Sequence, residues 1–313
     1  MLPDRRRVST SPDDDPPRLV LRRAALRQGY VDDEIAVLRR RGTWTSLQRG
    51  AYLVGDPALG RRARHLLVLQ ATLAGLRTSA VVSHASAAAL HGLPLWNVPL
   101  NQVHVTRRPP ARTDSDTRLR SHAARLPEED VVHVGPVPVT SVARTVVDLA
   151  RVLPFAPALS IADAALRHGG IAPEDLRRVL EAASGTRGTR AARRVVAAAD
   201  GRSESVGESR SRAIMIQSGL PLPDLQVEVR DAGGVLVGRC DFGWSDHRVL
   251  GEFDGRVKYG RLLRPGQTPG DVVFEEKRRE DALRDEGFGM VRWVWWDLDS
   301  PVAFTTRIAD RLR

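Results

Sequence analysis

Residues 236–254 read LVGRCDFGWSDHRVLGEFD, two alternating apolar and polar runs joined by a short polar turn. Alternation with a period of two is typical of β-strands, so the stretch predicts a β-hairpin. With Asp246 and His247 at the centre of the turn, the pairing places Asp241 directly opposite Glu252. Opposed residues share one face of a hairpin and have Cβ atoms about 5 Å apart.

The two faces of this hairpin differ in chemistry. The same pairing places Trp244 opposite Val249, and it places Phe242 opposite Gly251. Because side chains alternate along a strand, one face is apolar and suits a core. That face carries Phe242, Trp244, Val249 and Phe253, and the other carries Asp241, Glu252 and Asp254.

Carboxylates held this close repel one another unless something neutralises them. A divalent cation does so, and magnesium binds carboxylate oxygens together with water and substrate phosphate. Such an ion polarises a phosphodiester and lowers the pKa of an attacking water. Ion pairing with arginine is the alternative, and the nearby candidates are Arg239, Arg248 and Arg256.

The hairpin lies inside a longer alternation of helices and strands that follows a break near residues 200–203. We expect helices over 205–217 and 271–287, and strands over 225–231, 235–244, 249–255 and 290–296. The order α-β-β-β-α-β indicates an α/β domain over 201–313. The tryptophans of the last strand suit core packing better than base stacking.

Five motifs carry a family resemblance: GESRSR (207–212), CDFGW (240–244), GEFDG (251–255), RRED (278–281) and VRWVW (291–295). This part of the chain resembles the PD-(D/E)XK nuclease superfamily, in particular its branch similar to very-short-patch repair endonucleases. The resemblance implies a restriction-endonuclease-like fold and phosphodiester hydrolysis with Mg²⁺ or Mn²⁺. By position, the family's metal-binding acids are Glu208, Asp241 and Glu252.

The chain departs from the family at the lysine that follows the third-strand acid. Asp254 stands at that position, and Arg256 or Lys258 is the candidate for the missing positive charge. We therefore expect a catalytic set of Asp241, Glu252, Arg256 and Lys258, and metal ligands Glu208, Asp241, Glu252 and Asp254.

Two of these candidates have ordinary structural alternatives. Glu208 also fits an S-x-x-E capping box with Ser205, in which the glutamate bonds back to the N-cap amide. Arg279 is a candidate contact to DNA phosphate, whereas most charges of its helix suit a solvated face.

Residues 18–58 have the outline of a small DNA-binding module. A helix is expected over 19–30, ending at Gly29, and a second one, capped by Asp32 or Asp33, ends at Gly42. A hairpin is expected over 43–54, with its tip at Gln48–Gly50. Helix, turn, helix and hairpin is the layout of a winged helix-turn-helix.

A second resemblance rests on AALRQGY (24–30), LRRRGTW (38–44), LQRGAYL (47–53), SHASAAALHGLPLW (83–96) and PVTSVARTVVDLA (138–150). These motifs resemble actinobacterial relatives of AbiEi-type antitoxins, which implies operator DNA binding and a toxin protein as partner. We expect Arg39, Arg40 and Arg49 to contact DNA. Arg39 and Arg40 also suit the C-terminal dipole of their helix, so helix stability is an alternative role.

The middle region, 59–200, is expected to be mostly helical. Helices are predicted over 61–76, 83–93, 142–153, 156–170 and 173–184, with short strands over 101–107, 118–122 and 131–140. His84 and His91 are seven residues apart, which puts them on one helix face. No third ligand is visible near them in the sequence, so a structural pair is favoured over a metal site.

Composition sets the outer bounds. The net charge is +10, yet only two of the 48 basic residues are lysine, so the arginine bias reflects coding composition as well as a polyanion partner. One cysteine, Cys240, excludes an internal disulfide. We expect a tail over 1–17 without a signal peptide, no membrane span, and a cytoplasmic location.

These features together indicate a multidomain α+β protein: an N-terminal winged helix, a helical middle region and a C-terminal nuclease-like domain. The expected function is DNA binding with magnesium-dependent phosphodiester hydrolysis. The alternative is a non-catalytic, antitoxin-like transcriptional regulator whose C-terminal domain only binds DNA or a partner protein. The sequence leaves the oligomeric state and the choice between DNA and RNA open.

Overall fold

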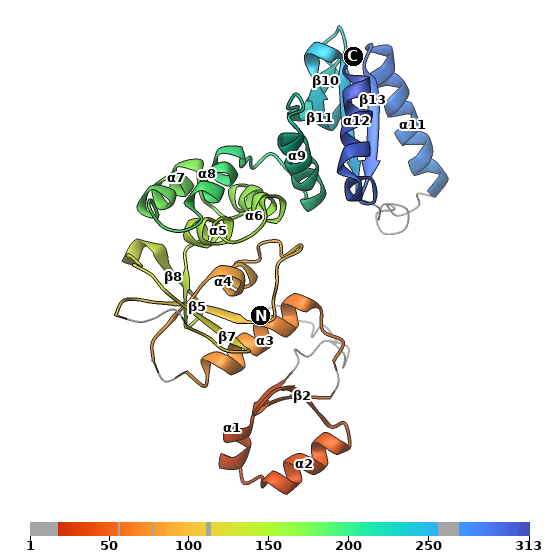
Figure 1. Cartoon of the computed structure of the whole chain (residues 1–313). Coiled ribbons are helices and arrows are strands. Elements are labelled where there is room, and N and C mark those ends of the chain that lie inside the picture. Colours follow the sequence, from red (N-terminus) through yellow and green to blue (C-terminus); the bar gives the residue numbers. More distant parts are fainter. Residues whose placement is uncertain (1–17, 56, 77, 111–113, 256–268) are drawn as a thin grey trace, which may run out of the picture.

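The computed structural model describes residues 18–55, 57–76, 78–110, 114–255 and 269–313, and the expected tail over 1–17 lies outside them. The described residues form three sheets and eleven α-helices, which confirms a mixed α+β architecture. Figure 1 shows the sheets following one another along the chain, from the one nearest the N-terminus to the one nearest the C-terminus. In these residues no helix combines the length and apolar character needed to cross a bilayer.

The N-terminal unit contains β1 (Leu19–Leu21), α1 (Arg22–Arg27), α2 (Asp32–Arg40), β2 (Trp44–Gln48) and β3 (Ala51–Val54). The sheet order is β1-β3-β2. The helix predicted from residue 19 begins at Arg22, because Leu19–Leu21 instead pairs with β3. The cap of α2 is also one residue earlier than expected: the N-cap is Val31, whose N–H is accepted by the Glu34 carboxylate at 3.0 Å.

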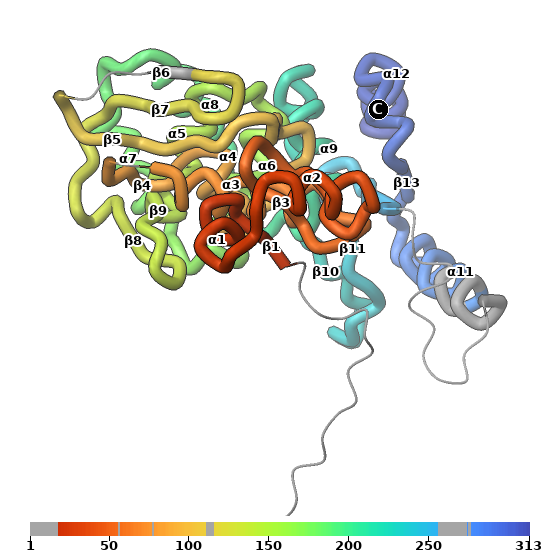
Figure 2. The backbone as a smooth tube through the Cα atoms, turned by 90° about the horizontal axis from the view of Figure 1, so that it is seen from below, coloured from red at the N-terminus to blue at the C-terminus, as the bar shows by residue number. Residues whose placement is uncertain are grey.

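The middle region contains the predicted helices, and its strands join into one sheet, which the sequence does not predict. Its first part consists of α3 (Arg61–Leu73), β4 (Val81–Val82), α4 (His84–Leu90), β5 (Val103–Arg107), β6 (Asp114–Ser115), β7 (Leu119–Ala123), β8 (Val131–Val134) and β9 (Val137–Thr140). The sheet order is β6-β7-β5-β4-β9-β8, so it pairs strands that are distant in sequence. Figure 2 shows β7, β5 and β4 side by side.

Four helices complete the middle region: α5 (Val142–Ala150), α6 (Phe155–His168), α7 (Pro173–Ala182) and α8 (Thr189–Ala198). The first three match their sequence predictions, whereas α8 was not predicted. Their apolar faces form one core cluster together with α4.

The C-terminal region contains α9 (Val206–Ser218), β10 (Asp224–Arg230), β11 (Leu236–Trp244), β12 (Val249–Asp254), α11 (Pro269–Asp285), β13 (Gly289–Val294) and α12 (Pro301–Arg311). The predicted order α-β-β-β-α-β is confirmed, with α12 as an additional last helix. The sheet order is β10-β11-β12-β13, and β12 and β13 run parallel. Of the late tryptophans, Trp293 is in the core, whereas Trp295 and Trp296 follow the strand.

Helix α9 connects this region to the helices before it. The buried carboxylate of Asp163, on α6, accepts hydrogen bonds from the Ser209 hydroxyl at 2.8 Å and the Arg212 guanidinium at 2.7 Å. It also accepts the backbone N–H of Asp200 at 2.8 Å. The break near residues 200–203 therefore marks a change in the order of helices and strands. Buried hydrogen bonds connect the segments on its two sides.

Candidate functional site

The predicted register of the β11–β12 hairpin is confirmed. Trp244 pairs with Val249 and Phe242 with Gly251, with the 3₁₀ turn Ser245–His247 between the strands. The expected apolar face lies in or against the C-terminal core, with Phe242, Trp244, Val249 and Phe253. Beyond the last ladder pair, Asp241 Oδ2 accepts the backbone N–H of Phe253 at 2.9 Å.

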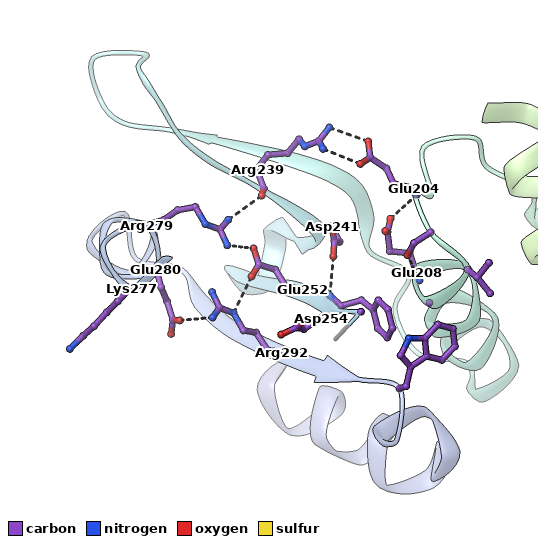
Figure 3. A pocket seen from close by; sticks show the side chains of 16 residues that line it. Glu204, Glu208, Arg239, Asp241, Glu252, Asp254, Lys277, Arg279, Glu280 and Arg292 are labelled. Atoms are coloured by element: carbon purple, nitrogen blue, oxygen red, sulfur yellow. Dashed lines mark hydrogen bonds and ion pairs between the residues drawn. The ribbon is translucent and has the colours of Figure 1, made fainter. Parts of the chain in front are cut away.

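The acidic face of the hairpin lines a cavity of about 920 Å³, bounded by α9, β11, β12, α11 and the segment from Arg292 to Trp295 (Figure 3). All four acids expected to bind metal line it, and so does Arg279. Its charged lining consists of Glu204, Glu208, Arg239, Asp241, Glu252, Asp254, Lys277, Arg279, Glu280 and Arg292. The cavity thus gathers acids and bases from five secondary-structure elements, α9, β11, β12, α11 and β13, and from the segment before α9.

Glu208 is in the first turn of α9 and is 6% exposed. Its backbone N–H is accepted by the Ser205 hydroxyl at 3.1 Å, which is one half of the expected capping box. The carboxylate does not bond back to the N-cap amide. Its Oε2 instead accepts the N–H of Glu204 at 2.7 Å and the Gln226 amide at 3.0 Å.

Burial and a neighbouring negative charge both affect the ionisation of Glu208. Burial raises the pKa of the Glu208 carboxyl to about 7, and the negative charge of Asp241 contributes in the same direction. Both effects penalise the ionised form, since a carboxylate loses water and meets a like charge. A cation between the two carboxylates would offset that penalty.

Gln226 is a site residue that the sequence analysis missed. It lies in β10 with φ at +56°, a left-handed conformation that is rare for a non-glycine residue. Its Nε2 bonds to Glu208, while its Oε1 is buried and has no hydrogen-bond partner among the described residues. A single glutamine in an alternating strand gave no signal of this role.

Glu252 is held by arginines in this structure. Arg279 Nη2 donates to Glu252 Oε1 at 2.5 Å, and Arg292 Nε donates to Oε2 at 3.0 Å. Ion pairing was therefore the right alternative for Glu252, but with arginines from α11 and β13. These partners come from distant segments, so hairpin geometry alone could not identify them.

The arginines expected beside the hairpin have other partners. Arg239 pairs with Glu204 at 3.1 Å, and Arg248 donates to the carbonyl oxygens of Gly287 and Glu286. Arg256 lies outside the described residues, as does Lys258.

Asp254, which the sequence analysis placed where the similar nucleases have a lysine, lines the cavity. The lysine that also lines it is Lys277, on α11. Figure 3 shows the amino end of Lys277 directed away from Asp241 and Glu252. A positive charge is thus present at the cavity edge on a helix that the sequence analysis had not considered for this role.

The donor set suits a hard cation in part. Carboxylate and amide oxygens are ligands that magnesium accepts, and one or two protein carboxylates suffice for it. Glu208 and Asp241 line the cavity and fit such an ion, with Gln226 bonded to Glu208 behind them, whereas Glu252 fits only after Arg279 and Arg292 release it. Among the described residues, one group of three His, Cys, Asp or Glu side chains has its ligand atoms all within 4.8 Å of one another. That group consists of three histidines outside this cavity.

The three arginines expected to contact DNA from the N-terminal unit are all exposed. Arg49 is at the β2–β3 turn, followed by Gly50 in a left-handed conformation. Arg39 lies over the Tyr52 ring, 5.8 Å from its centroid, at the end of α2 beside Arg40.

No family model matches the chain. Two curated proteins of Mycobacterium tuberculosis are similar to it: Uncharacterized protein MT2308 (strain CDC 1551 / Oshkosh) and Uncharacterized protein Rv2248 (strain H37Rv). Each is 36% identical over 154 residues, which is 45% of this chain and 56% of the relative. The chain thus spans little more than half the length of these relatives.

Among solved structures, the crystal structure of the RV2827C protein from Mycobacterium tuberculosis is similar, with a TM-score of 0.39 and 15% identity. That match covers 70% of this chain and 85% of the other. These comparisons assign no activity to the chain.

Proposed function

We propose that the chain binds DNA through its N-terminal unit and hydrolyses phosphodiesters in the C-terminal cavity with a divalent Mg²⁺ or Mn²⁺ ion. One observation carries the proposal: Glu208 and Asp241 line the same cavity, and the pKa of Glu208 is raised to about 7. Two acids under this electrostatic penalty are suited to share a cation, because a bound cation removes it.

The residues around the two acids divide into two roles. Glu208 and Asp241 would hold the ion, which when bound polarises the phosphodiester and lowers the pKa of an attacking water. Glu252 holds Arg279 and Arg292 at the cavity wall, where a guanidinium can pair with a phosphate oxygen. Asp241 also fixes the end of β12 through the Phe253 N–H.

A non-catalytic, antitoxin-like regulator is the second candidate, and one observation favours it. Glu252 is neutralised by two arginines, and Asp254 stands where the nucleases that the chain resembles have a lysine. In that case the cavity binds DNA or a partner protein without cleaving.

A cleavage assay separates the two functions. Supercoiled and linear DNA, with an RNA arm, are incubated with the full chain and Mg²⁺ or Mn²⁺. We expect nicking by the wild type, loss in Asp241→Asn and Glu208→Gln, and full activity in the control Asp246→Asn, at the exposed hairpin turn. Equal cleavage by all variants, or none by any despite DNA binding, would refute the catalytic proposal.

A further inference from the structure

Three histidines from separate elements meet in the middle region. His84 is the first residue of α4, His104 is in β5 and His122 is in β7. Strands β5 and β7 are parallel neighbours, and Thr106 pairs with His122. Because side chains alternate along strands, His104, Thr106 and His122 share one sheet face. The other face carries Val103 and Val105, which pack in the apolar cluster with α3.

The ring nitrogens of these histidines converge. One nitrogen from each of the three lies within 4.8 Å of the others. His104 Nδ1 and His122 Nε2 are 3.1 Å apart, and the rings of His84 and His122 stack with centroids 3.8 Å apart. The sequence analysis had grouped His84 with His91 instead. In the structure, His91 Nε2 bonds to the carbonyl oxygen of Thr140 at 2.7 Å, away from this group.

The environment keeps the rings neutral. Burial lowers the pKa of His104 to about 3 and that of His122 to about 4, and it lowers the pKa of His84 as well. Neutral imidazole is the form that ligates metals, because its unprotonated nitrogen carries the lone pair. The hydroxyl of Thr106 is also buried, with no hydrogen-bond partner among the described residues.

The positive charges near the histidine cluster are partly offset by a buried carboxylate. Arg144 and Arg151, on α5 and at its end, lie near the histidines and act against a cation. Both are paired with the buried Asp148, at 2.8 and 3.3 Å, which screens their charge. Arg120, on β7, remains as a positive charge beside the site.

We propose that His84, His104 and His122 form a binding site for a divalent transition metal, with zinc as the best-fitting ion. Three imidazole nitrogens are a recognised zinc donor set that leaves a fourth position for water or another ligand. At Zn–N distances of about 2.1 Å, tetrahedral ligand nitrogens are about 3.4 Å apart. The stacked rings of His84 and His122 would have to turn out of their parallel arrangement for both lone pairs to point at one ion. The site is distinct from the acidic cavity, whose oxygen donors suit a different ion.

Metal titration of the full chain tests the proposal. The protein is stripped with chelator and titrated with zinc by calorimetry, and with cobalt by absorption, which reports nitrogen coordination. We expect one zinc ion per chain at this site. His104→Ala and His122→Ala should weaken zinc binding by more than about 100-fold, because even loss of an outer partner of a ligand costs 10- to 100-fold. The exposed His133 provides the matched control, His133→Ala, with unchanged affinity.

A footprint on the wild type removes any dependence on how the variants fold. Diethyl pyrocarbonate modifies histidines, and mass spectrometry of the peptides locates the adducts. Zinc should protect His104 and His122 while leaving His133 reactive. Absence of zinc binding by the wild type, or zinc binding that leaves the reactivity of His104 and His122 unchanged, would overturn the proposal.

Discussion

The carboxylate of Asp241 accepts the backbone N–H of Phe253 at 2.9 Å, just beyond the last ladder pair of the β11–β12 hairpin. The same side chain lines the acidic cavity. Asp241 therefore has two separable properties, a hydrogen-bond acceptor that completes the strand pairing and a negative charge in the cavity. Substitutions can remove one and keep the other.

Asp241→Ala should destabilise the C-terminal region by about 1 to 2 kcal/mol, because it leaves the Phe253 N–H without its acceptor. Asp241→Asn keeps an acceptor oxygen and should cost less than about 1 kcal/mol. Urea unfolding followed by tryptophan fluorescence measures both, since Trp244, Trp293, Trp295 and Trp296 are four of the six tryptophans. Equal losses for the two variants would contradict the acceptor role.

The raised pKa of Glu208 predicts a pH-dependent stability. The folded-state pKa of about 7 lies above the ordinary glutamate value of about 4.3, so the folded chain keeps a proton that the unfolded chain releases. The Glu208 contribution to stability in chelator should therefore fall as pH rises from about 4.5 to about 7, by up to about 3 kcal/mol, and then level off. The lowered pKa values of His84, His104 and His122 contribute with the opposite sign, because the unfolded chain binds protons that these buried rings do not.

Glu208→Gln cannot ionise and should remove this contribution, so that its stability relative to the wild type rises with pH between pH 5 and 8. Urea midpoints measured across that range provide the test. Glu174→Gln, at a glutamate whose side chain is 72% exposed, is the matched control and should retain the wild-type slope. An unchanged slope in Glu208→Gln would mean that another group carries the titration.

Arg49→Ala should lower DNA affinity and reduce the dependence of log affinity on log salt by about one unit, as expected for one lost phosphate contact. Fluorescence anisotropy at several salt concentrations measures both quantities. Arg190→Ala removes the same charge from the exposed face of α8 and should leave the salt slope unchanged. If both substitutions changed the affinity and the salt slope equally, the change in net charge alone would explain the effect of Arg49→Ala.

Gly207→Ala should destabilise the chain by about 2 to 3 kcal/mol through overpacking. A Cβ at Gly207 would lie 1.9 Å from Cε1 of Phe253, so the first turn of α9 or the Phe253 ring must move. Gly238→Ala meets atoms only at 3.5 Å and beyond and serves as the control. If a urea titration gave Gly207→Ala the same stability as the wild type, the Phe253 ring would have moved aside at no cost in free energy. Adding Phe253→Leu should restore part of any loss.

The hairpin was predictable from sequence because its determinants are local. A two-residue turn centre and alternating apolar residues were enough to pair Trp244 with Val249, and the structure has that register. The partners of Glu252 were not predictable. Arg279 and Arg292 are 27 and 40 residues further along, on α11 and β13, and only the packing of those elements brings them to the carboxylate.

The same limit explains what was missed in the middle region. The strand runs over 101–107, 118–122 and 131–140 were predicted singly, whereas the short strands β4 and β6 were not. The union of all these strands into a six-stranded sheet depends on long-range pairing. His104 and His122 are 18 residues apart and become neighbours only because β5 and β7 run parallel in that sheet. Helical spacing suggested His91 as the companion of His84, since periodicity reports contacts only within one element.

Glu208 and Ser209 are consecutive residues of α9 that face different parts of the molecule. One carboxylate is in the cavity, and the next side chain is bonded to Asp163 of α6. Successive residues of an α-helix are about 100° apart around its axis, so the two contacts together fix the axial rotation of α9. A rotation or tilt of α6 would therefore move the Glu208 carboxylate relative to Asp241. The distance between these two acids thus depends on the position of the neighbouring helices.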